Sequence, residues 1–196
     1  STDVRGNTRT YTYDAANRLL TESDPLGGVT EFTYDPVGNL VRVTAPLGRI
    51  TTHTYNVKDQ LVSTVDPGGY TTVYTYDAVG NQTSVRDGNL HTTSFTYDAA
   101  NRLASTIDPL GHTTIYAYDN NGNRTGVTDT LGHITTYVYD TLDRQTQVVD
   151  ALAHATTTYD GVGNVLSVTD PNNHTTAYAY NAANQLVTVT DARGGT

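Results

Sequence analysis

The chain has no cysteine, methionine or tryptophan, only two glutamates and a single lysine. Without cysteine it can form neither a disulfide framework nor a thiolate zinc site, and it has no cysteine nucleophile. Because the strong helix formers Glu, Lys and Met are nearly missing, an all-helical fold is excluded. No run approaches the roughly 20 apolar residues of a membrane-spanning helix. With 11 basic against 20 acidic residues, the chain is also a poor match for a nucleic-acid-binding protein.

The abundant residues favour β-structure. The 196 residues include 38 threonines, 15 tyrosines and 15 asparagines. Threonine and tyrosine are enriched in strands, and tyrosines dispersed along the whole chain argue against disorder. This composition is compatible with an extracellular setting, and we expect a secreted or cell-surface protein that is not inserted in a membrane.

A tyrosine followed by Asp or Asn recurs throughout the chain. The spacing is 21 residues everywhere except between Tyr139 and Tyr159, where it is 20. Such a fixed period indicates a repeat architecture. We therefore interpret residues 1–196 as one continuous array of about nine units and as a segment of a longer repeat region. The repeat tyrosines, predicted to be structural residues, are Tyr13, Tyr34, Tyr55, Tyr76, Tyr97, Tyr118, Tyr139, Tyr159 and Tyr180.

Each unit has room for two short strands and two turns. The fourth position after the tyrosine is always Gly, Asn or Asp, the residues that best tolerate the left-handed backbone region. Eleven positions after the tyrosine, an aspartate usually opens a second turn such as Asp24-Pro25-Leu26-Gly27, and Ala45 is the exception. The segments between the turns, such as 61–65 and 113–118, are typical strands. The sequence predicts an all-β fold of about eighteen strands, in tandem hairpins that form a twisted or spiralling antiparallel sheet.

The second strand of each unit alternates, with aromatic residues and the repeat tyrosine on one face. We expect this aromatic face to be the buried one, with a partner for each tyrosine hydroxyl. Valines of the first strand, such as Val127, are expected to join it. His53 stands at an aromatic position, and we interpret it as a packing substitute. The tyrosines expected to be far less exposed than the residues before them are Tyr76, Tyr97 and Tyr118, preceded by Thr75, Thr96 and Ala117.

Two irregularities stand out in the repeat. The unit that begins at Tyr139 lacks one residue; because a deletion inside a strand would turn its side chains to the wrong face, we expect the loss near Ala153-His154-Ala155. Thr157 there replaces an aromatic, so this hairpin should be the weakest-packed.

Asn also recurs at every fourth unit in the left-handed position, which indicates either duplication of a four-unit block or four units per superhelical turn.

The segment Tyr34-Asp35-Pro36-Val37-Gly38-Asn39-Leu40 resembles the YD repeat of RHS-repeat proteins, and Tyr97-Asp98-Ala99-Ala100-Asn101-Arg102-Leu103 is a variant of it. This family includes bacterial RHS toxins, the B–C shell of insecticidal toxin complexes and teneurins. The resemblance implies strands coiled into a spiralling sheet, often a hollow shell around a polypeptide cargo that an aspartyl autoprotease releases. The Asp-Pro-x-Gly strings here are in phase with the turns, so we interpret them as turns and do not assign the protease role.

Other sites are poorly supported by the sequence. A column of histidines, expected to be exposed turn residues, lies fifteen positions after the repeat tyrosines. Equivalent residues of neighbouring hairpins are about 9.5 Å apart, too far for an easy zinc site. One aspartate per turn is explained by turn capping, and no calcium loop, phosphate loop or hydrolase motif is present. We therefore predict no enzyme activity, metal or cofactor. The histidines are His91, His112, His133, His154 and His174.

Two functions remain. The first is a structural array that forms a piece of an RHS-type shell wall or an extracellular fibre. Its partners would be neighbouring repeats or copies stacked end to end, and an encapsulated polypeptide. The alternative is an adhesion module that binds surface glycans or proteins. A sugar site should show extra aromatics in one loop, and Tyr70 is the only such turn aromatic, which favours the structural array. The ends of the chain, 2–8 and 190–196, match each other in sequence and repeat phase, so we expect an open-ended array.

Overall fold

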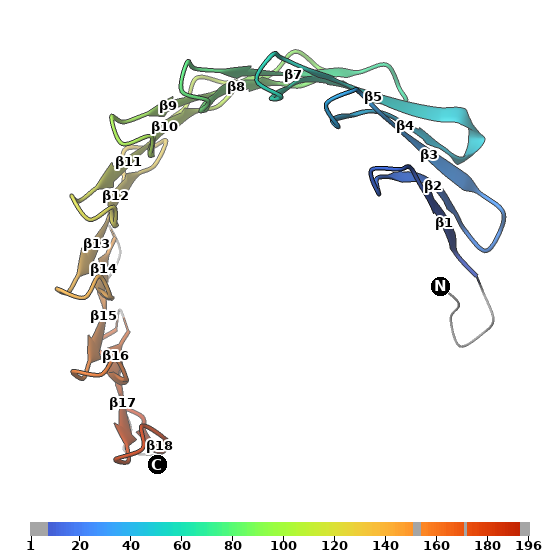
Figure 1. Ribbon diagram of the computed structural model, residues 1–196. Coiled ribbons are helices and arrows are strands. Elements are labelled where there is room, and N and C mark those ends of the chain that lie inside the picture. Colours follow the sequence, from blue (N-terminus) through green and yellow to red (C-terminus); the bar gives the residue numbers. More distant parts are fainter. Residues whose placement is uncertain (1–7, 151–153, 171, 193–196) are drawn as a thin grey trace. The chain divides into compact units, whose positions relative to one another are not determined.

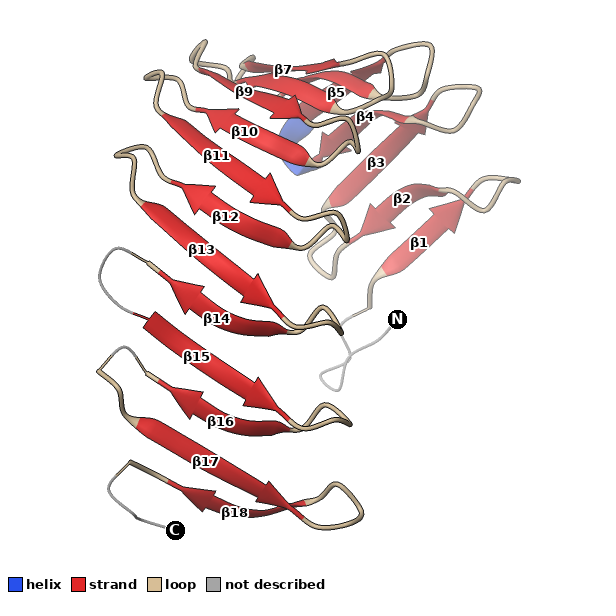
Figure 2. Cartoon of the chain, turned by 90° about the vertical axis from the view of Figure 1, so that its left-hand side faces the viewer, coloured by secondary structure: helices blue, strands red, loops and turns tan. Residues whose placement is uncertain are grey.

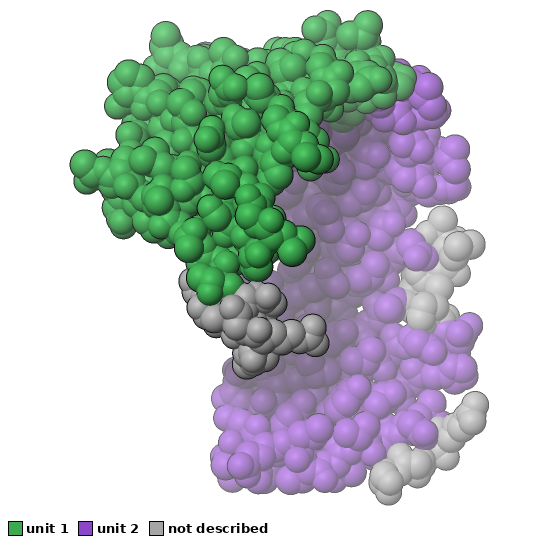
Figure 3. Space-filling view, turned by 90° about the vertical axis from the view of Figure 1, so that its right-hand side faces the viewer, with its two compact units in different colours: residues 1–94 green, residues 95–196 purple. Residues whose placement is uncertain are grey.

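The computed structural model describes residues 8–150, 154–170 and 172–192. These residues form eighteen β-strands and one short 3-10 helix, in two compact units, Ser1–Ser94 and Phe95–Thr196 (Figure 3). The all-β fold and the strand number expected from the sequence are confirmed. The matching ends of the chain, apart from Thr8 and 190–192, lie outside the described residues.

In the first unit each strand pairs antiparallel with the next strand along the chain (Figure 1). One return between strands contains the 3-10 helix η1 (Pro46–Gly48), at the unit where Ala45 replaces the turn aspartate. The strands are β1 (Thr10–Tyr13), β2 (Leu19–Ser23), β3 (Val29–Tyr34), β4 (Leu40–Ala45), β5 (Arg49–Tyr55), β6 (Leu61–Val65), β7 (Thr71–Tyr76), β8 (Gln82–Arg86) and the start of β9 (Thr92–Tyr97).

The second unit repeats the same meander of hairpins, and the strands from β11 onward are seen side by side in Figure 2. It begins with the end of β9. Its other strands are β10 (Leu103–Ile107), β11 (Thr113–Tyr118), β12 (Arg124–Thr128), β13 (Ile134–Tyr139), β14 (Gln145–Val149), β15 (His154–Tyr159), β16 (Val165–Thr169), β17 (Thr175–Tyr180) and β18 (Leu186–Thr190).

A β-bulge recurs next to the repeat tyrosine. In β3 and β4, for example, Thr33 lies opposite Arg42 but Tyr34 lies opposite Leu40, so Val41 is the extra residue. The same shift occurs in the hairpin of β11 and β12 and in six further hairpins. A bulge increases the local twist of a strand pair. The sequence analysis did not anticipate it.

The aromatic face is the less exposed face of the sheet, but it is not a buried core. Phe32 lies opposite Val43 and Tyr116 opposite Val127, so the valines of the first strands join the aromatic layer as expected. Tyr118 is half-buried and Ala117 exposed, and the same holds for the other two pairs that the sequence singled out. However, no described residue is fully buried. The expectation that this face is buried was wrong in degree. The described residues form a single-layer sheet, so its aromatic side chains are at most half-buried.

The unit with a missing residue keeps its strand register. The connection from β14 to β15 is one residue shorter than the connection from β12 to β13. Thr157 still lies opposite Val168, as Tyr137 lies opposite Val148 in the preceding hairpin. Strands β14 and β15 keep their pairing, and the place expected for the loss, near Ala153, lies outside the described residues and stays a prediction. Whether this hairpin is the weakest-packed stays a prediction.

Candidate functional site

Six repeat tyrosines hydrogen-bond to the strand that precedes their own along the chain. The Tyr34 hydroxyl, at the end of β3, donates a hydrogen bond to the carbonyl oxygen of Leu19 at the start of β2, at 3.0 Å. Tyr118 makes the same bond to Leu103, also at 3.0 Å. The expected hydroxyl partner is thus present, and it is a backbone carbonyl next to the bulge. The equivalent bonds of other units are made by Tyr55, Tyr76, Tyr139 and Tyr159.

The five residues after each repeat tyrosine form a tight turn, here called the YD turn. In 14–18, the Asp14 carboxylate accepts hydrogen bonds from the amides of Ala16 and Arg18, both at 2.9 Å. The fourth residue, Asn17, has a φ of 61°. A positive φ at this position occurs in all nine YD turns, which confirms the left-handed position expected from the sequence. The YD turns are 14–18, 35–39, 56–60, 77–81, 98–102, 119–123, 140–144, 160–164 and 181–185.

The fifth residue of a YD turn extends to the next YD turn along the chain. Arg102 binds the Asp98 carboxylate of its own turn at 2.8 Å and donates through Nη1 to the Asp119 carbonyl oxygen at 2.7 Å. Its guanidinium lies 4.7 Å from the centre of the Tyr118 ring. The asparagine at the same position of the next turn, Asn123, donates to Asp119 at 3.0 Å and to Asp143 at 2.6 Å. Consecutive turns are therefore joined by side chains as well as by strands.

These contacts favour the ionised form of the Asp77 and Asp119 carboxyls. The Asn81 side-chain amide, with the backbone amides of its turn, lowers the pKa of the Asp77 carboxyl below its usual value, despite partial desolvation. The same arrangement lowers the pKa of Asp119 through Asn123. Because each carboxylate already accepts several hydrogen bonds, it acts as the structural centre of its turn.

The turns at the other end of the hairpins, here called return turns, are built on the predicted aspartates. The Asp108 carboxylate accepts from the amides of Leu110 and His112, at 2.8 and 2.9 Å. The His112 Nδ1 atom lies 2.9 Å from the second oxygen of Asp108, and the pKa of this carboxyl is lowered mainly by that hydrogen bond. The capping role expected for these aspartates is confirmed here. The return turns described in this way are 24–28, 66–70, 87–91, 108–112, 129–133 and 170–174.

The histidine column consists of exposed pairs with the aspartate of the same turn. His112, His133 and His174 lie 2.9, 2.9 and 3.1 Å from their aspartates, and His91 lies 3.4 Å from Asp87. Within the described residues, no three His, Asp or Glu side chains form a group that could hold a metal ion. His154 begins β15 rather than lying in a turn.

His53 lies in the aromatic layer of β5, where its Nδ1 is 3.0 Å from the Thr64 hydroxyl on the neighbouring strand β6. This contact agrees with its interpretation as a packing residue.

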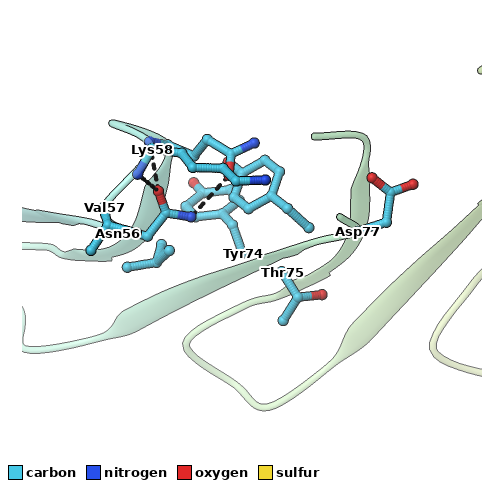
Figure 4. A pocket seen from close by; sticks show the side chains of 9 residues that line it. Asn56, Val57, Lys58, Tyr74, Thr75 and Asp77 are labelled. Atoms are coloured by element: carbon cyan, nitrogen blue, oxygen red, sulfur yellow. Dashed lines mark hydrogen bonds between the residues drawn. The ribbon is translucent and has the colours of Figure 1, made fainter. Parts of the chain in front are cut away.

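The surface hollows of the sheet follow the repeat. A hollow of about 350 Å³ is lined by the YD turn at Asn56 and Lys58 and by Tyr74, Thr75 and Asp77 (Figure 4). A hollow of about 440 Å³ lies at the equivalent place in the second unit, between the YD turn 140–144 and residues 156–159. A feature that recurs in register is a property of the repeat, so neither hollow singles out a substrate site.

The sequence analysis missed the contacts between YD turns. At the fourth position, where the sequence analysis found only Gly, Asn or Asp, Gly alternates with the other two, and the fifth position was not used. There Arg or Gln alternates with Asn, in phase with the fourth position. Two adjacent columns that alternate together were the signal that would have indicated pairing between successive turns.

The RHS Repeat family model matches the chain at residues 1–29, 13–50, 34–71, 55–92, 76–113, 97–134, 118–155 and 159–196. The chain belongs to the RHS-repeat family. None of the curated proteins matches it in sequence. No helix among the described residues is long and apolar enough to cross a membrane.

Solved structures with the same fold include the crystal structure of TcdB2-TccC3, with a TM-score of 0.65 and 16% identity over 98% of this chain. The same complex without its hypervariable C-terminal region gives a TM-score of 0.60 and 16% identity over 93% of this chain. The crystal structure of TcdB2-TccC3-TEV gives a TM-score of 0.54 and 17% identity over 92% of this chain. The RHS-repeat chain spans only 14%, 13% and 13% of the length of those chains. At these identities the similarity establishes the fold.

Proposed function

We propose that this chain is a non-catalytic structural segment of an RHS-type shell, in which the single-layer sheet forms part of the wall. The observation that carries the proposal is the linkage of successive YD turns, such as Arg102 to Asp119 and Asn123 to Asp143. These links stiffen a sheet that has no fully buried residue among those described. A wall needs a thin, continuous and laterally rigid layer, and this combination provides it.

The repeat-wide distribution of polar groups supports a structural role over catalysis. An active site needs titratable groups whose environments differ from one another. Here the carboxylates of Asp77 and Asp119 have equivalent partners in their own turns, and the pKa of both is lowered. Function therefore resides in the array and not in one hairpin.

The partners in this proposal are the neighbouring repeats, further copies end to end, and a polypeptide held on one side of the wall. The location is extracellular, after secretion. An extracellular fibre is the other form that a long array of these hairpins would take. Both forms require that residues 1–196 continue into further repeats.

Electron microscopy of the full-length parent protein tests the proposal. Closed particles whose wall contains hairpins with the register of β3 and β4 are the expected result. Filaments would favour the fibre, and a compact globular particle without a wall or filament would overturn both. Mass spectrometry of the purified particles then identifies an enclosed polypeptide.

One observation favours a second candidate, a carbohydrate-binding surface. Tyr70 is 58% exposed in a return turn, and glycines at 68 and 88 leave space for its ring: an added Cβ at Gly88 would lie 2.5 Å from the Tyr70 Cβ. Tyrosine is enriched at binding interfaces because its ring is apolar and its hydroxyl polar. Glycan-array binding that is lost in Tyr70→Ala, with Tyr74→Phe as the control, would support this candidate. An array without binding removes it.

A further inference from the structure

We propose that the YD turns fall into two complementary classes, and that each hairpin accepts as its neighbour only a hairpin of the other class. Arginine-class turns carry Asn or Asp at the fourth position and Arg or Gln at the fifth; they are 14–18, 56–60, 98–102, 140–144 and 181–185. Glycine-class turns carry Gly at the fourth position and Asn at the fifth; they are 35–39, 77–81, 119–123 and 160–164. The unit that assembles into the sheet is then a pair of hairpins.

An arginine-class turn binds the backbone of the glycine-class turn that follows it. Arg102 donates to the Asp119 carbonyl at 2.7 Å and Arg144 to the Asp160 carbonyl at 3.0 Å. Gln60 takes the same direction and reaches the Gly80 carbonyl at 3.4 Å. In each case the donor comes from the fifth position and the acceptor is a main-chain oxygen of the next YD turn.

A glycine-class turn binds a side chain of the arginine-class turn that follows it. The amide of Asn39 donates to Asp59 Oδ1 at 2.8 Å, and that of Asn123 donates to Asp143 Oδ1 at 2.6 Å. Asn164 makes the equivalent bond to Asn184, at 3.2 Å. The acceptor is always the fourth residue, which must therefore carry a side-chain oxygen.

Neighbours of the same class lose the link between asparagine and the fourth residue, although an Arg or Gln could still reach a main-chain oxygen of either class. Between two glycine-class turns, the asparagine amide would face a glycine that has no side-chain acceptor. Between two arginine-class turns, an Asp such as Asp143 would have no asparagine donor. The backbone differs as well, because φ is 109°, 108°, 97° and 108° at the four glycines but 58–61° at the fourth residue of the arginine class. The glycine-class values are strained for residues that carry a Cβ.

The alternation holds within each unit without exception. In the first unit the links run from turn 14–18 to 35–39, then to 56–60 and 77–81. In the second unit they run from 98–102 through 119–123, 140–144 and 160–164 to 181–185. These seven links alternate strictly, so they define the order in which hairpins of the two classes follow one another. This rule is separate from the role of the array as a wall.

Deleting one hairpin or two from the full chain tests the rule. Removal of 35–55 joins Tyr34 to Asn56 in correct repeat register but places two arginine-class turns side by side. Removal of 35–76 joins Tyr34 to Asp77 and keeps the classes alternating. We expect the smaller deletion to give the less stable protein, with a melting temperature at least about 4 °C below that of the larger deletion. A smaller deletion that is equally or more stable would overturn the rule.

Substitutions decide the question if neither deletion folds. The double change Gly122→Asn with Asn123→Arg converts one glycine-class turn to the arginine class. The matched control, Asp143→Asn with Arg144→Gln, changes the same number of residues but keeps the class, since Asn184 and Gln185 already occupy those positions. The conversion should lower the melting temperature by more than the control does, and by more than Gly122→Ala, which changes the backbone preference alone. Equal losses in the conversion and the control would contradict the proposal.

Discussion

The two rows of turns use the same first residue in different ways. In a YD turn, an aspartate such as Asp119 is the centre of its own turn and its carbonyl oxygen also receives Arg102 from the turn before. In a return turn, an aspartate such as Asp108 binds the amides and the histidine of its own turn. The YD turns therefore join hairpins through side-chain hydrogen bonds, whereas the hydrogen bonds of a return turn such as 108–112 close its own hairpin.

The difference shows what a repeat sequence must specify. A turn that only closes a hairpin needs the correct backbone conformation, and many sequences provide it. The return turns accordingly vary, from Asp-Pro-Leu-Gly at 108–111 to Asp-Gly-Asn-Leu at 87–90, where Leu90 has a φ of 69°. A turn that also binds its neighbours must match them, and the YD turns vary only between two classes.

Acid should have the largest effect, because it acts on both rows of turns. The pKa values of Asp77 and Asp108 are lowered by side-chain hydrogen bonds from Asn81 and His112, respectively. A carboxyl whose folded pKa lies below its unfolded value stabilises the fold above the unfolded value, and this contribution is lost as pH falls through the folded value. We expect a constant melting temperature from pH 7 to about 5 and a steep loss below about pH 4.

The control for the acid prediction is Asp77→Asn, since Asn56 and Asn181 already begin two YD turns. This variant should lose less stability than the unmodified chain between pH 5 and pH 2. A melting temperature that is independent of pH down to 2 would show that the carboxylates do not hold the turns.

Loss of a repeat tyrosine should be the largest effect of a single substitution. Tyr118→Ala removes a half-buried ring, its contact with Arg102 and its hydrogen bond to the Leu103 carbonyl. A fully buried aromatic costs about 3–5 kcal/mol when truncated, so we expect about 2–3 kcal/mol here by urea denaturation. Tyr118→Phe removes only the hydroxyl and should cost about 1 kcal/mol. Equal losses in the two variants would mean that the hydroxyl, and not the ring, carries the stabilisation.

Much of the fold could be predicted from the sequence because the pattern is local. The period of the repeat tyrosines, the Gly, Asn and Asp at the left-handed position and the alternation of Tyr116 and Tyr118 each report on a few neighbouring residues. The degree of burial could not be predicted, because Tyr118 has the same sequence context whether or not a second layer packs on its face of the sheet. The bulge at Val41 and the link from Arg102 to Asp119 depend on the relation between strands or units. A single repeat does not contain that information.

The stabilities of Arg102→Ala, in a YD turn, and His112→Ala, in a return turn, compare the two rows of turns most directly. Arg102 binds Asp98, the Asp119 carbonyl and the Tyr118 ring, so its loss should cost about 1–2 kcal/mol. The side chain of His112 is 53% exposed and pairs only with the aspartate of its own return turn among the contacts described, so its loss should cost less than about 0.5 kcal/mol. Chemical denaturation of the two variants and their parent measures both values. If the histidine variant is the less stable of the two, the return turns contribute more to cohesion than the YD turns.

The smallest change in stability is expected for alanine substitutions of two glycines in the same hairpin, Gly122 in the YD turn and Gly126 in β12. Gly122 has a φ of 97°, where a side chain is strained although no atom lies within 4 Å of an added Cβ. Gly122→Ala should therefore cost about 1 kcal/mol through the backbone alone. At Gly126 an added Cβ meets the Cβ of Ala117 at 3.5 Å, an ordinary contact, in a strand where glycine is unfavourable. Gly126→Ala should thus be neutral or stabilising by up to about 0.5 kcal/mol in the same denaturation experiment. The opposite order of the two variants would mean that the backbone conformation of the YD turn does not constrain which residue the array accepts at this position.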